Sequence, residues 1–414
     1  MLHTPQQGRV HQPFELENNP IFRIPIFPSS SVPFHLTSLE SCGQVPILTM
    51  EPNPQVIAAL QALTKTPRME DQFPKMIPKH CEVCQATTGL LRCSACNIYY
   101  YCGRDHQMAD RSTHRKTCDT IKDTKKQVAD IEAKLRAQVP NPFETDRGRF
   151  WLFKIHRTYL QARFLHSEMQ VRSWRHQGVA DALDNLLGGL DLDRGDSQGQ
   201  RFVIPFLFLR FGRDQQCYDF CKFWQKSFMG ESPSDARDLS VPFLNIDGDD
   251  PTETVDLWAR SKFTPLASLS ALYLIKLRLR QGLQAAQDCM TANPGMSSQD
   301  ILAKVRGKYC GDILEKKPAL IADDDTVSTA IETPDGQLSR LFLAVNTSNP
   351  DYWKLMVKPT DDVVSNMPGA YIPGSLEEAK YVFMNSYSAW AETPEAIQGI
   401  RDTARVLSSG GRTA

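Results

Sequence analysis

Residues 81–118 read CEVCQATTGLLRCSACNIYYYCGRDHQMADRSTHRKTC, and they hold six of the eleven cysteines of this 414-residue chain. The potential metal ligands in the segment are Cys81, Cys84, Cys93, Cys96, Cys102, His106, His114 and Cys118. Thiolate and imidazole are the ligands that tetrahedral zinc prefers, and four of them around an ion leave no position for water or substrate. Eight donors therefore predict two closed, structural zinc sites.

The same segment offers few large apolar residues from which to build a core. Zinc binding would supply its folding free energy, on the order of 10 kcal/mol per structural site at neutral pH. The segment is therefore expected to fold only with metal. Spacing alone leaves the pairing of the ligands open, because sequential and interleaved arrangements both use four donors per ion.

These residues resemble the MYND finger. Its pattern is matched by Cys81-x2-Cys84, Cys93-Ser94-Ala95-Cys96, Tyr101-Cys102, His106-Gln107 and His114-x3-Cys118. The resemblance covers about forty residues, a tenth of the chain. It implies cross-braced sites, with Cys81, Cys84, Cys102 and His106 on one ion and Cys93, Cys96, His114 and Cys118 on the other. Each site would then hold three thiolates and one neutral imidazole, with a formal charge of −1.

The resemblance also implies a partner-binding surface. In peptide-binding members of the family, residues matching Ser94, Gln107 and a tryptophan line a shallow groove for short proline-containing motifs. This chain keeps Ser94 and Gln107 but has Arg111 at the tryptophan position. The loss of an aromatic wall weakens the expectation of proline recognition, and Arg111 is either a recognition residue or a solvated helical residue.

Composition restricts the remaining classes of function. The chain has 47 basic and 48 acidic residues and a formal net charge of −1, so no whole-chain field favours nucleic acid or an anionic membrane. No segment approaches the roughly 20 apolar residues of a membrane helix. Clustered cysteines favour a reducing compartment. We expect an intracellular protein with no membrane partner, in either the nucleus or the cytoplasm.

The chain divides into segments of different character. Residues 1–77 are rich in Pro, Ser and Gln and are predicted to be mostly disordered, with a short helix near 54–64. The finger is expected at 78–120 and a connecting helix at 121–140, ending before Pro140. Apolar spacing predicts a helical domain at 141–290, an irregular segment at 291–340 and a C-terminal helical region at 341–414.

Particular residues define the expected helices. Leu152, Ile155, Tyr159, Ala162, Leu165 and Met169 recur at steps of three and four and predict one apolar stripe. Gly188-Gly189 is expected to end the next helix, and residues 266–279 to form a long apolar one. Pro334-Asp335-Gly336 predicts a turn, while Ser375 and Glu378 have capping-box spacing. The fold is expected to be mainly α, either a solenoid such as a tetratricopeptide-like array or an irregular bundle.

The helical part resembles, more loosely, the long C-terminal region of fungal MYND-finger proteins of uncharacterised activity. The similar stretches are residues 194–199, 209–215, 217–220, 349–353 and 374–379. This resemblance implies relatives but supplies no mechanism.

Four functions compete at this point. The favoured one is an adaptor or regulatory protein whose finger binds other proteins. Nucleic-acid binding is an alternative, through the basic residues Arg92, Arg104, Arg111, Arg115 and Lys116, although they also serve to offset the charge of the zinc–thiolate sites. A SET-type lysine methyltransferase would need an Asn-His-Ser-Cys motif, and the nearest string, at 346–349, lacks its histidine and cysteine. The finger could also have a purely structural role and only stabilise the helical domain. We therefore expect no enzymatic activity.

Overall fold

The computed structural model of the protein describes residues 75–229, 239–261, 264–360, 363, 368 and 371–409. The predicted disorder before residue 75 and the predicted helix at 54–64 lie outside these residues. Residues 75–77, which were expected to be disordered, are instead held in place. The N–H of Ile77 donates to the carbonyl of Trp174 at 2.7 Å, and the Ile77 carbonyl accepts from the N–H of His176 at 2.9 Å.

Two short strands and two helices make up the finger. Strand β1 (Leu91–Arg92) pairs antiparallel with β2 (Tyr100–Tyr101), so that Leu91 lies opposite Tyr101. Helix α2 (Arg104–Ala109) follows, and then helix α3 (Arg111–Arg136). The predicted connecting helix thus begins ten residues earlier than expected, inside the finger, and ends before Pro140 as predicted.

Helices dominate the rest of the described chain. In order they are α4 (Pro142–Thr145), η3 (Phe150–Leu152), α5 (Lys154–Val171), α6 (His176–Leu192), η4 (Gln200–Phe202), α7 (Ile204–Arg210), α8 (Asp214–Phe228), α9 (Asp256–Ala259), α10 (Leu266–Ala292), α11 (Ser298–Val305), α12 (Ile313–Lys316), η5 (Pro318–Ile321), α13 (Asp324–Ser348), α14 (Tyr352–Val357), α16 (Leu376–Ala391) and α17 (Ala396–Ser408). The mainly α prediction is confirmed. In the described part of the chain, no helix combines the length and apolarity that a membrane crossing requires.

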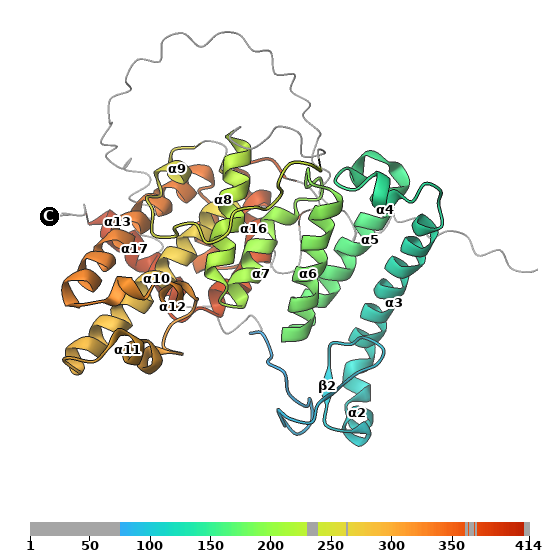
Figure 1. Ribbon diagram of the computed structural model, residues 1–414, viewed down its shortest axis with the longest axis horizontal. Helices are drawn as coiled ribbons and strands as arrows, with labels where there is room; N and C mark the ends of the chain where they lie inside the picture. Colours follow the sequence, from blue (N-terminus) through green and yellow to red (C-terminus); the bar gives the residue numbers. More distant parts are fainter. Residues whose placement is uncertain are drawn as a thin grey trace, which may run out of the picture.

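The helices have two kinds of arrangement (Figure 1). Helices α3, α5, α6 and α7 each pack on the next, as successive helices of a solenoid do. Beyond them, α10 is surrounded by α7, α8, α13, α16 and α17, as the central helix of a bundle. The expected irregular bundle is therefore present, and α3, α5 and α6 precede it as consecutively packed helices.

The core of the bundle is aromatic as well as aliphatic. Every residue of α10 from Leu266 to Leu279 is buried, in agreement with the predicted apolar helix. Tyr273 packs on Trp353 and Trp390, with ring centroids 5.1 Å and 5.7 Å apart. Such ring pairs add about 0.5–1.5 kcal/mol each beyond their buried area, so this cluster fixes the position of α14 and α16 against α10.

A buried arginine ties the helices together. The guanidinium of Arg278, on α10, donates to the carboxylate of Asp214 at 2.8 Å and to the carbonyl of Leu209 at 2.8 Å. It also donates to the Ala389 carbonyl at 3.3 Å. Because Leu209 and Ala389 lie in the last turns of α7 and α16, the cation meets the negative ends of two helix dipoles.

Two predicted breaks are wrong. Helix α6 continues through Gly188 and Gly189 to Leu192. A Cβ on Gly189 would lie 2.6 Å from Oε1 of Gln200, so this glycine lies in close contact with that side chain inside the helix and does not end it. Helix α13 likewise runs through Pro334, which is buried. The irregular segment expected at 291–340 is therefore largely helical.

The start of α13 explains the acidic triplet at 323–325. The side chain of Asp323 accepts a hydrogen bond from the N–H of Thr326 at 2.7 Å and caps the helix. Asp324 and Asp325 occupy the first turn, where the helix dipole favours negative charge. The capping box predicted at Ser375 is half confirmed, since its hydroxyl accepts from the N–H of Glu378 at 3.2 Å. The Glu378 carboxylate instead accepts from the N–H of Gly374 and from Asn349.

Candidate metal centre

Two similar turns position the cysteine pairs. In the first, the N–H of Gln85 donates to the carbonyl of Cys81 at 3.0 Å, and in the second the N–H of Asn97 donates to Cys93 at 2.8 Å. Gln85 and Asn97 both adopt positive φ, at 62° and 61°. This left-handed conformation is uncommon for residues other than glycine. Each turn brings its two thiols to one side of the backbone.

The first site combines one turn with the start of α2. Its ligands are Cys81, Cys84, Cys102 and His106, and their donor atoms all lie within 4.8 Å of one another. Sγ of Cys84 lies 3.6 Å from Sγ of Cys102, and Nδ1 of His106 lies 3.4 Å from Sγ of Cys81. Cys84 and Cys102 are exposed, so this site lies near the surface of the finger.

The second site combines the other turn with α3. Its ligands Cys93, Cys96, His114 and Cys118 are all buried, and their donor atoms also lie within 4.8 Å of one another. Sγ of Cys93 lies 3.7 Å from Sγ of Cys118, and Sγ of Cys96 lies 3.3 Å from Nε2 of His114. Helix α3 thus supplies two ligands one turn apart.

These separations fit zinc. Thiolates at about 2.3 Å from a tetrahedral zinc ion lie about 3.8 Å apart, and a thiolate and an imidazole nitrogen lie about 3.6 Å apart. None of the six thiols forms a disulfide. The interleaved pairing is therefore the one that the fold produces, and two structural zinc ions fit the two groups of donors.

The acidity of the ligands is consistent with metal binding. Burial raises the pKa of the Cys81 thiol, but hydrogen bonds from the backbone of Cys84, Val83 and Cys102 outweigh it and bring the pKa to about 6. The hydrogen bond with Cys84 and burial raise the pKa of Cys102 to about 11. Neighbouring thiols cannot all ionise without a cation between them, and zinc supplies that charge.

The imidazole of His114 has a supporting chain of hydrogen bonds. Its Nδ1 lies 3.0 Å from the hydroxyl of Tyr101, which donates to Oδ2 of Asp110 at 2.8 Å. Because that hydroxyl proton points to Asp110, Nδ1–H of His114 donates to the Tyr101 oxygen and leaves Nε2 free to bind metal. Burial lowers the pKa of His114, which favours the neutral imidazole that a metal ligand requires.

The geometry defines a cross-braced, two-zinc finger. Residues 81–118 match the family model of the MYND finger, and the resemblance drawn from the sequence is confirmed for this segment. The match identifies the finger and does not extend to the helical remainder. No curated protein and no solved structure matches the chain, so the likeness of the helical part to fungal proteins stays a prediction.

The finger is docked on the turn between α5 and α6. Arg175 donates to both carboxylate oxygens of Glu82, at 3.1 Å and 2.7 Å, and its guanidinium lies 4.2 Å from the ring centroid of Tyr99. The hydroxyl of Tyr100 donates to Gln177 at 2.8 Å. On the chain just before the finger, the N–H of Met76 donates to the carboxylate of Glu392 at 2.7 Å. Several independent contacts therefore hold the finger at a fixed orientation.

Helix α3 makes the attachment continuous. After Cys118 it packs along α5, where the hydroxyl of Thr124 lies 2.9 Å from Nδ1 of His166. Near its end, Tyr159 donates to Glu132 at 2.9 Å. His166 is buried, and burial lowers its pKa to about 4. It acts as a neutral packing residue and belongs to neither group of metal-binding donors.

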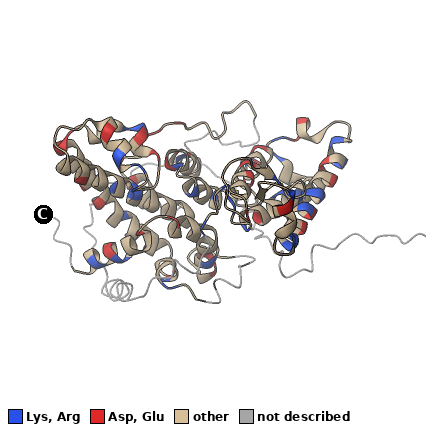
Figure 2. Cartoon of the chain, turned by 90° about the horizontal axis from the view of Figure 1, so that it is seen from below, with Lys and Arg blue, Asp and Glu red and all other residues tan. Residues whose placement is uncertain are grey.

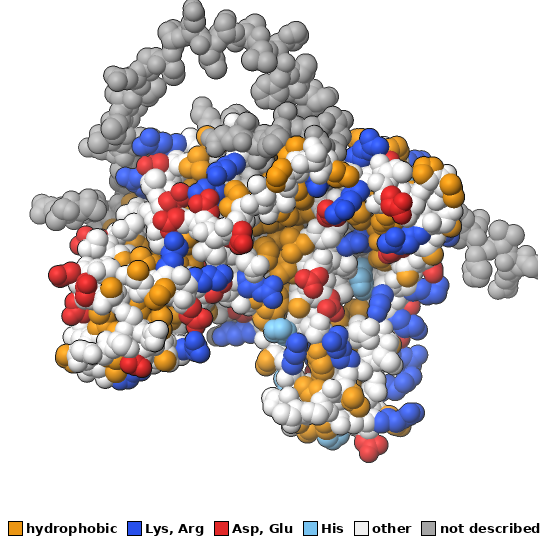
Figure 3. Space-filling model, viewed as in Figure 1, with side chains coloured by type: hydrophobic (Ala, Val, Ile, Leu, Met, Phe, Trp, Pro, Cys, Tyr) orange, Lys and Arg blue, Asp and Glu red, His pale blue; other side chains and the backbone are white. Residues whose placement is uncertain are grey.

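The predicted partner-binding residues are at least partly accessible to solvent. Ser94 and Arg111 are exposed and Gln107 is half-buried. Their side chains make no hydrogen bond or ion pair within the described residues. Apolar side chains are exposed on the finger as well, since Leu91 is 65% and Met108 63% exposed. Figure 3 shows apolar side chains among Lys and Arg on the projecting finger.

The basic residues are solvent-facing and not paired with the thiolates. All five residues that were expected to offset the zinc sites are exposed: Arg92, Arg104, Arg111, Arg115 and Lys116. Arg115 instead lies 3.6 Å from Asp119, one turn further along α3. Figure 2 shows Lys and Arg concentrated on the finger and α3, with Asp and Glu between them.

Sequence reasoning missed the residues that orient and dock the finger. Tyr101 and Asp110 lie within the finger, and a search for polar residues beside the ligands could have suggested them. Arg175 lies 93 positions from Glu82, and no local pattern marks that contact.

Proposed function

We propose that this protein is an adaptor or regulatory protein without catalytic activity, whose MYND finger binds short segments of partner proteins. The observation that carries the proposal is the contrast between two sets of finger residues. Glu82 and Tyr100 are bound to Arg175 and Gln177 of the helical scaffold, whereas the finger also carries polar side chains that make no hydrogen bond within the described residues and apolar side chains that are exposed.

The finger has features of a peptide-binding surface. Strand β1 is an edge strand, because it pairs only with β2 among the described residues. Extended peptides add to such edges through main-chain hydrogen bonds, and pockets for alternate side chains supply specificity. Exposed Leu91, on β1, and Met108, on α2, offer apolar contacts to such a peptide.

The three predicted partner-binding residues suggest which peptides bind. Ser94 and Gln107 provide hydrogen-bonding groups, and Arg111 provides a positive charge in place of an aromatic wall. A guanidinium favours carboxylates through paired, charge-assisted hydrogen bonds. We therefore expect partner segments that combine apolar residues with an acidic residue, and short proline-containing segments belong in the same test.

The coordination of the two zinc ions is the reason for proposing that the protein has no catalytic activity. Both groups of donors supply four ligands, and a saturated tetrahedral zinc ion offers no position to a substrate or water. The ions would therefore act by fixing the shape of the finger.

Selection from a displayed peptide library against the full chain, loaded with zinc, tests the proposal. The full chain is needed because a fragment ending soon after Cys118 would cut α3. Leu91→Asp and Met108→Asp should each weaken binding of selected peptides by about tenfold or more. Val139→Asp is the matched control, since Val139 is 97% exposed beyond the other end of α3.

Two outcomes would count against peptide binding. One is a selection that enriches no sequence, and the other is unchanged affinity in both finger variants. Nucleic-acid binding makes a different prediction, namely a complex whose affinity falls steeply with salt and is lost when Arg104, Arg111 and Arg115 are neutralised. Acidic residues lie between these arginines and would repel phosphates, so nucleic-acid binding is the less favoured function.

A further inference from the structure

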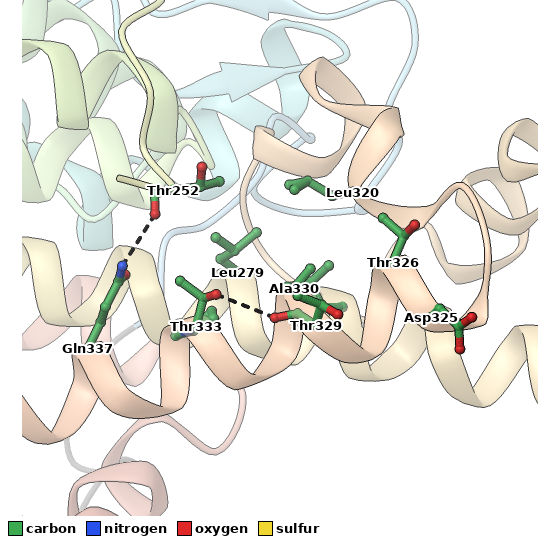
Figure 4. A pocket seen from close by; sticks show the side chains of 11 residues that line it. Thr252, Leu279, Leu320, Asp325, Thr326, Thr329, Ala330, Thr333 and Gln337 are labelled. Atoms are coloured by element: carbon green, nitrogen blue, oxygen red, sulfur yellow. Dashed lines mark hydrogen bonds between the residues drawn. The ribbon is translucent and has the colours of Figure 1, made fainter. Parts of the chain in front are cut away.

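A cavity of about 560 Å³ lies in the bundle, away from the finger. Helices α10 and α13, η5 and the loop before α9 line it, and it is open to solvent (Figure 4). Its volume falls within the range of about 300–1,000 Å³ that is typical of small-molecule sites. Neither zinc site contributes to its lining.

Side-chain size explains why the cavity exists. On the side of α13 that faces it, Thr326, Thr329, Ala330 and Thr333 recur at helical spacing and are all short. Leu279, on α10, and Leu320, on η5, supply apolar walls (Figure 4). Helices α10 and α13 pack closely, but these short side chains do not fill the space beside them.

A buried amide closes one end. Gln337 is 8% exposed, and its Nε2 donates to the carbonyls of Thr252 at 3.3 Å and Glu253 at 3.0 Å. The reverse orientation would place Oε1 against two carbonyl oxygens, so the amide orientation is fixed. Its Oε1 has no hydrogen-bond partner within the described residues. An unpaired buried acceptor is unfavourable. Because this oxygen is fully buried, a small shift of the amide toward the pocket would be needed for a donor from a bound molecule to satisfy it.

The charges of the lining restrict the ligand further. Asp325 is the charged residue of the lining, and no Lys or Arg belongs to it. Gln337 and Asp325 lie at opposite ends of the row of labelled residues in Figure 4. Anionic molecules such as fatty acids or phosphates would therefore meet an acceptor at one end and a carboxylate at the other.

We propose that this cavity binds a neutral, elongated apolar molecule that carries a hydroxyl or amide N–H donor at its Gln337 end. The apolar body would contact Leu279, Leu320 and Ala330, and the donor would pair with Oε1 of Gln337. The site is independent of the finger and adds small-molecule binding to the proposed adaptor role.

Three probes of equal chain length test the chemistry: 1-decanol, decyl methyl ether and decanoate. Each is titrated into the zinc-loaded full chain and followed by calorimetry. We expect saturable binding of 1-decanol, with affinity about fivefold or more above that of the ether, which lacks a donor. Decanoate should bind about tenfold more weakly than the alcohol. Equal affinities for alcohol and ether, tighter binding of decanoate, or no saturable binding would overturn the proposal.

Variants locate the binding. Thr329→Trp places a large side chain in the cavity from an exposed position and should weaken 1-decanol binding by about tenfold or more. Thr347→Trp is the control, because Thr347 is exposed on the same helix but outside the lining. Gln337→Met should abolish the preference for the alcohol over the ether, even if the neighbouring loop loosens. Unchanged affinity in Thr329→Trp would place the ligand elsewhere.

Discussion

The hydroxyl of Tyr101 lies 3.0 Å from Nδ1 of His114, a nitrogen on the opposite side of the ring from the one that faces the thiols. The histidine is thereby held in the tautomer and orientation that its site requires. Groups that support a metal ligand in this way typically change metal affinity by about 10–100-fold when they are removed.

Tyr101→Phe should therefore weaken zinc binding at the buried site by about tenfold or more, while the fold persists at saturating zinc. Competition with a chromophoric chelator measures the affinity of each ion. Tyr100→Phe is the control, because its hydroxyl bonds to Gln177 and not to a ligand. Equal zinc affinity in the two variants would show that the hydrogen bond to His114 does not support the metal.

Removal of zinc should unfold the finger and leave the bundle folded. Helix α2 and the first two turns of α3 depend on ligands His106, His114 and Cys118, whereas α10 and its neighbours have their own core. Metal analysis should give two zinc ions per chain, and chelation should reduce helical circular dichroism only in part. Double substitution of Cys102 and His114 should reproduce that result. A cooperative loss of all helical signal would contradict it.

The docking contact of Arg175 predicts a local effect. Arg175→Ala leaves Glu82 half-buried without its partner, at a cost of about 1.5–3 kcal/mol for charge-assisted hydrogen bonds. Hydrogen exchange should accelerate at the amides of Ile77 and His176, which bond across the same junction. Arg172→Ala removes an exposed arginine of the same turn and should leave these amides protected.

Two helical glycines should respond in opposite directions to alanine. A Cβ on Gly178 would lie 2.3 Å from Oγ of Ser173 and 2.5 Å from the Gln170 carbonyl, so Gly178→Ala should destabilise the protein by about 1–3 kcal/mol. A Cβ on Gly336 would meet nothing within 4 Å. Gly336→Ala should stabilise α13 by about 0.5–1 kcal/mol. Thermal unfolding of the two variants measures both effects. If Gly336→Ala lowers the stability, the result would contradict a helix at this position and favour the turn predicted at residues 334–336.

The metal ligands were predictable because all of them lie in one short segment, and cysteine and histidine at such spacings typically bind zinc. Their pairing was not predictable from spacing. It came from the family resemblance, and the structure shows why it holds. Cys102 lies just before α2 and His106 lies on it, so this pair completes the site of the first cysteine turn. His114 and Cys118 lie one turn apart on α3 and complete the site of the second cysteine turn.

The helical class followed from apolar periodicity, but the buried faces did not. Leu152 and Ile155 belong to the predicted apolar stripe, yet they are 55% and 53% exposed. Their neighbour His156 is buried against Phe150 instead. Periodicity indicates that a helix has an apolar face, but packing against the neighbouring helices determines which of its residues are buried. The same limit applies to Pro334, where packing on α10 retains a helix that local preference would interrupt.

Helix α3 begins among the zinc ligands and continues without interruption along α5, so one continuous helix joins the finger to the scaffold. A protein segment bound to the finger would therefore lie at a constant distance from the bundle and in a constant orientation to it. With partner binding as proposed, the continuous helix would set the distance between a partner on the finger and the bundle, which an unstructured linker would not do.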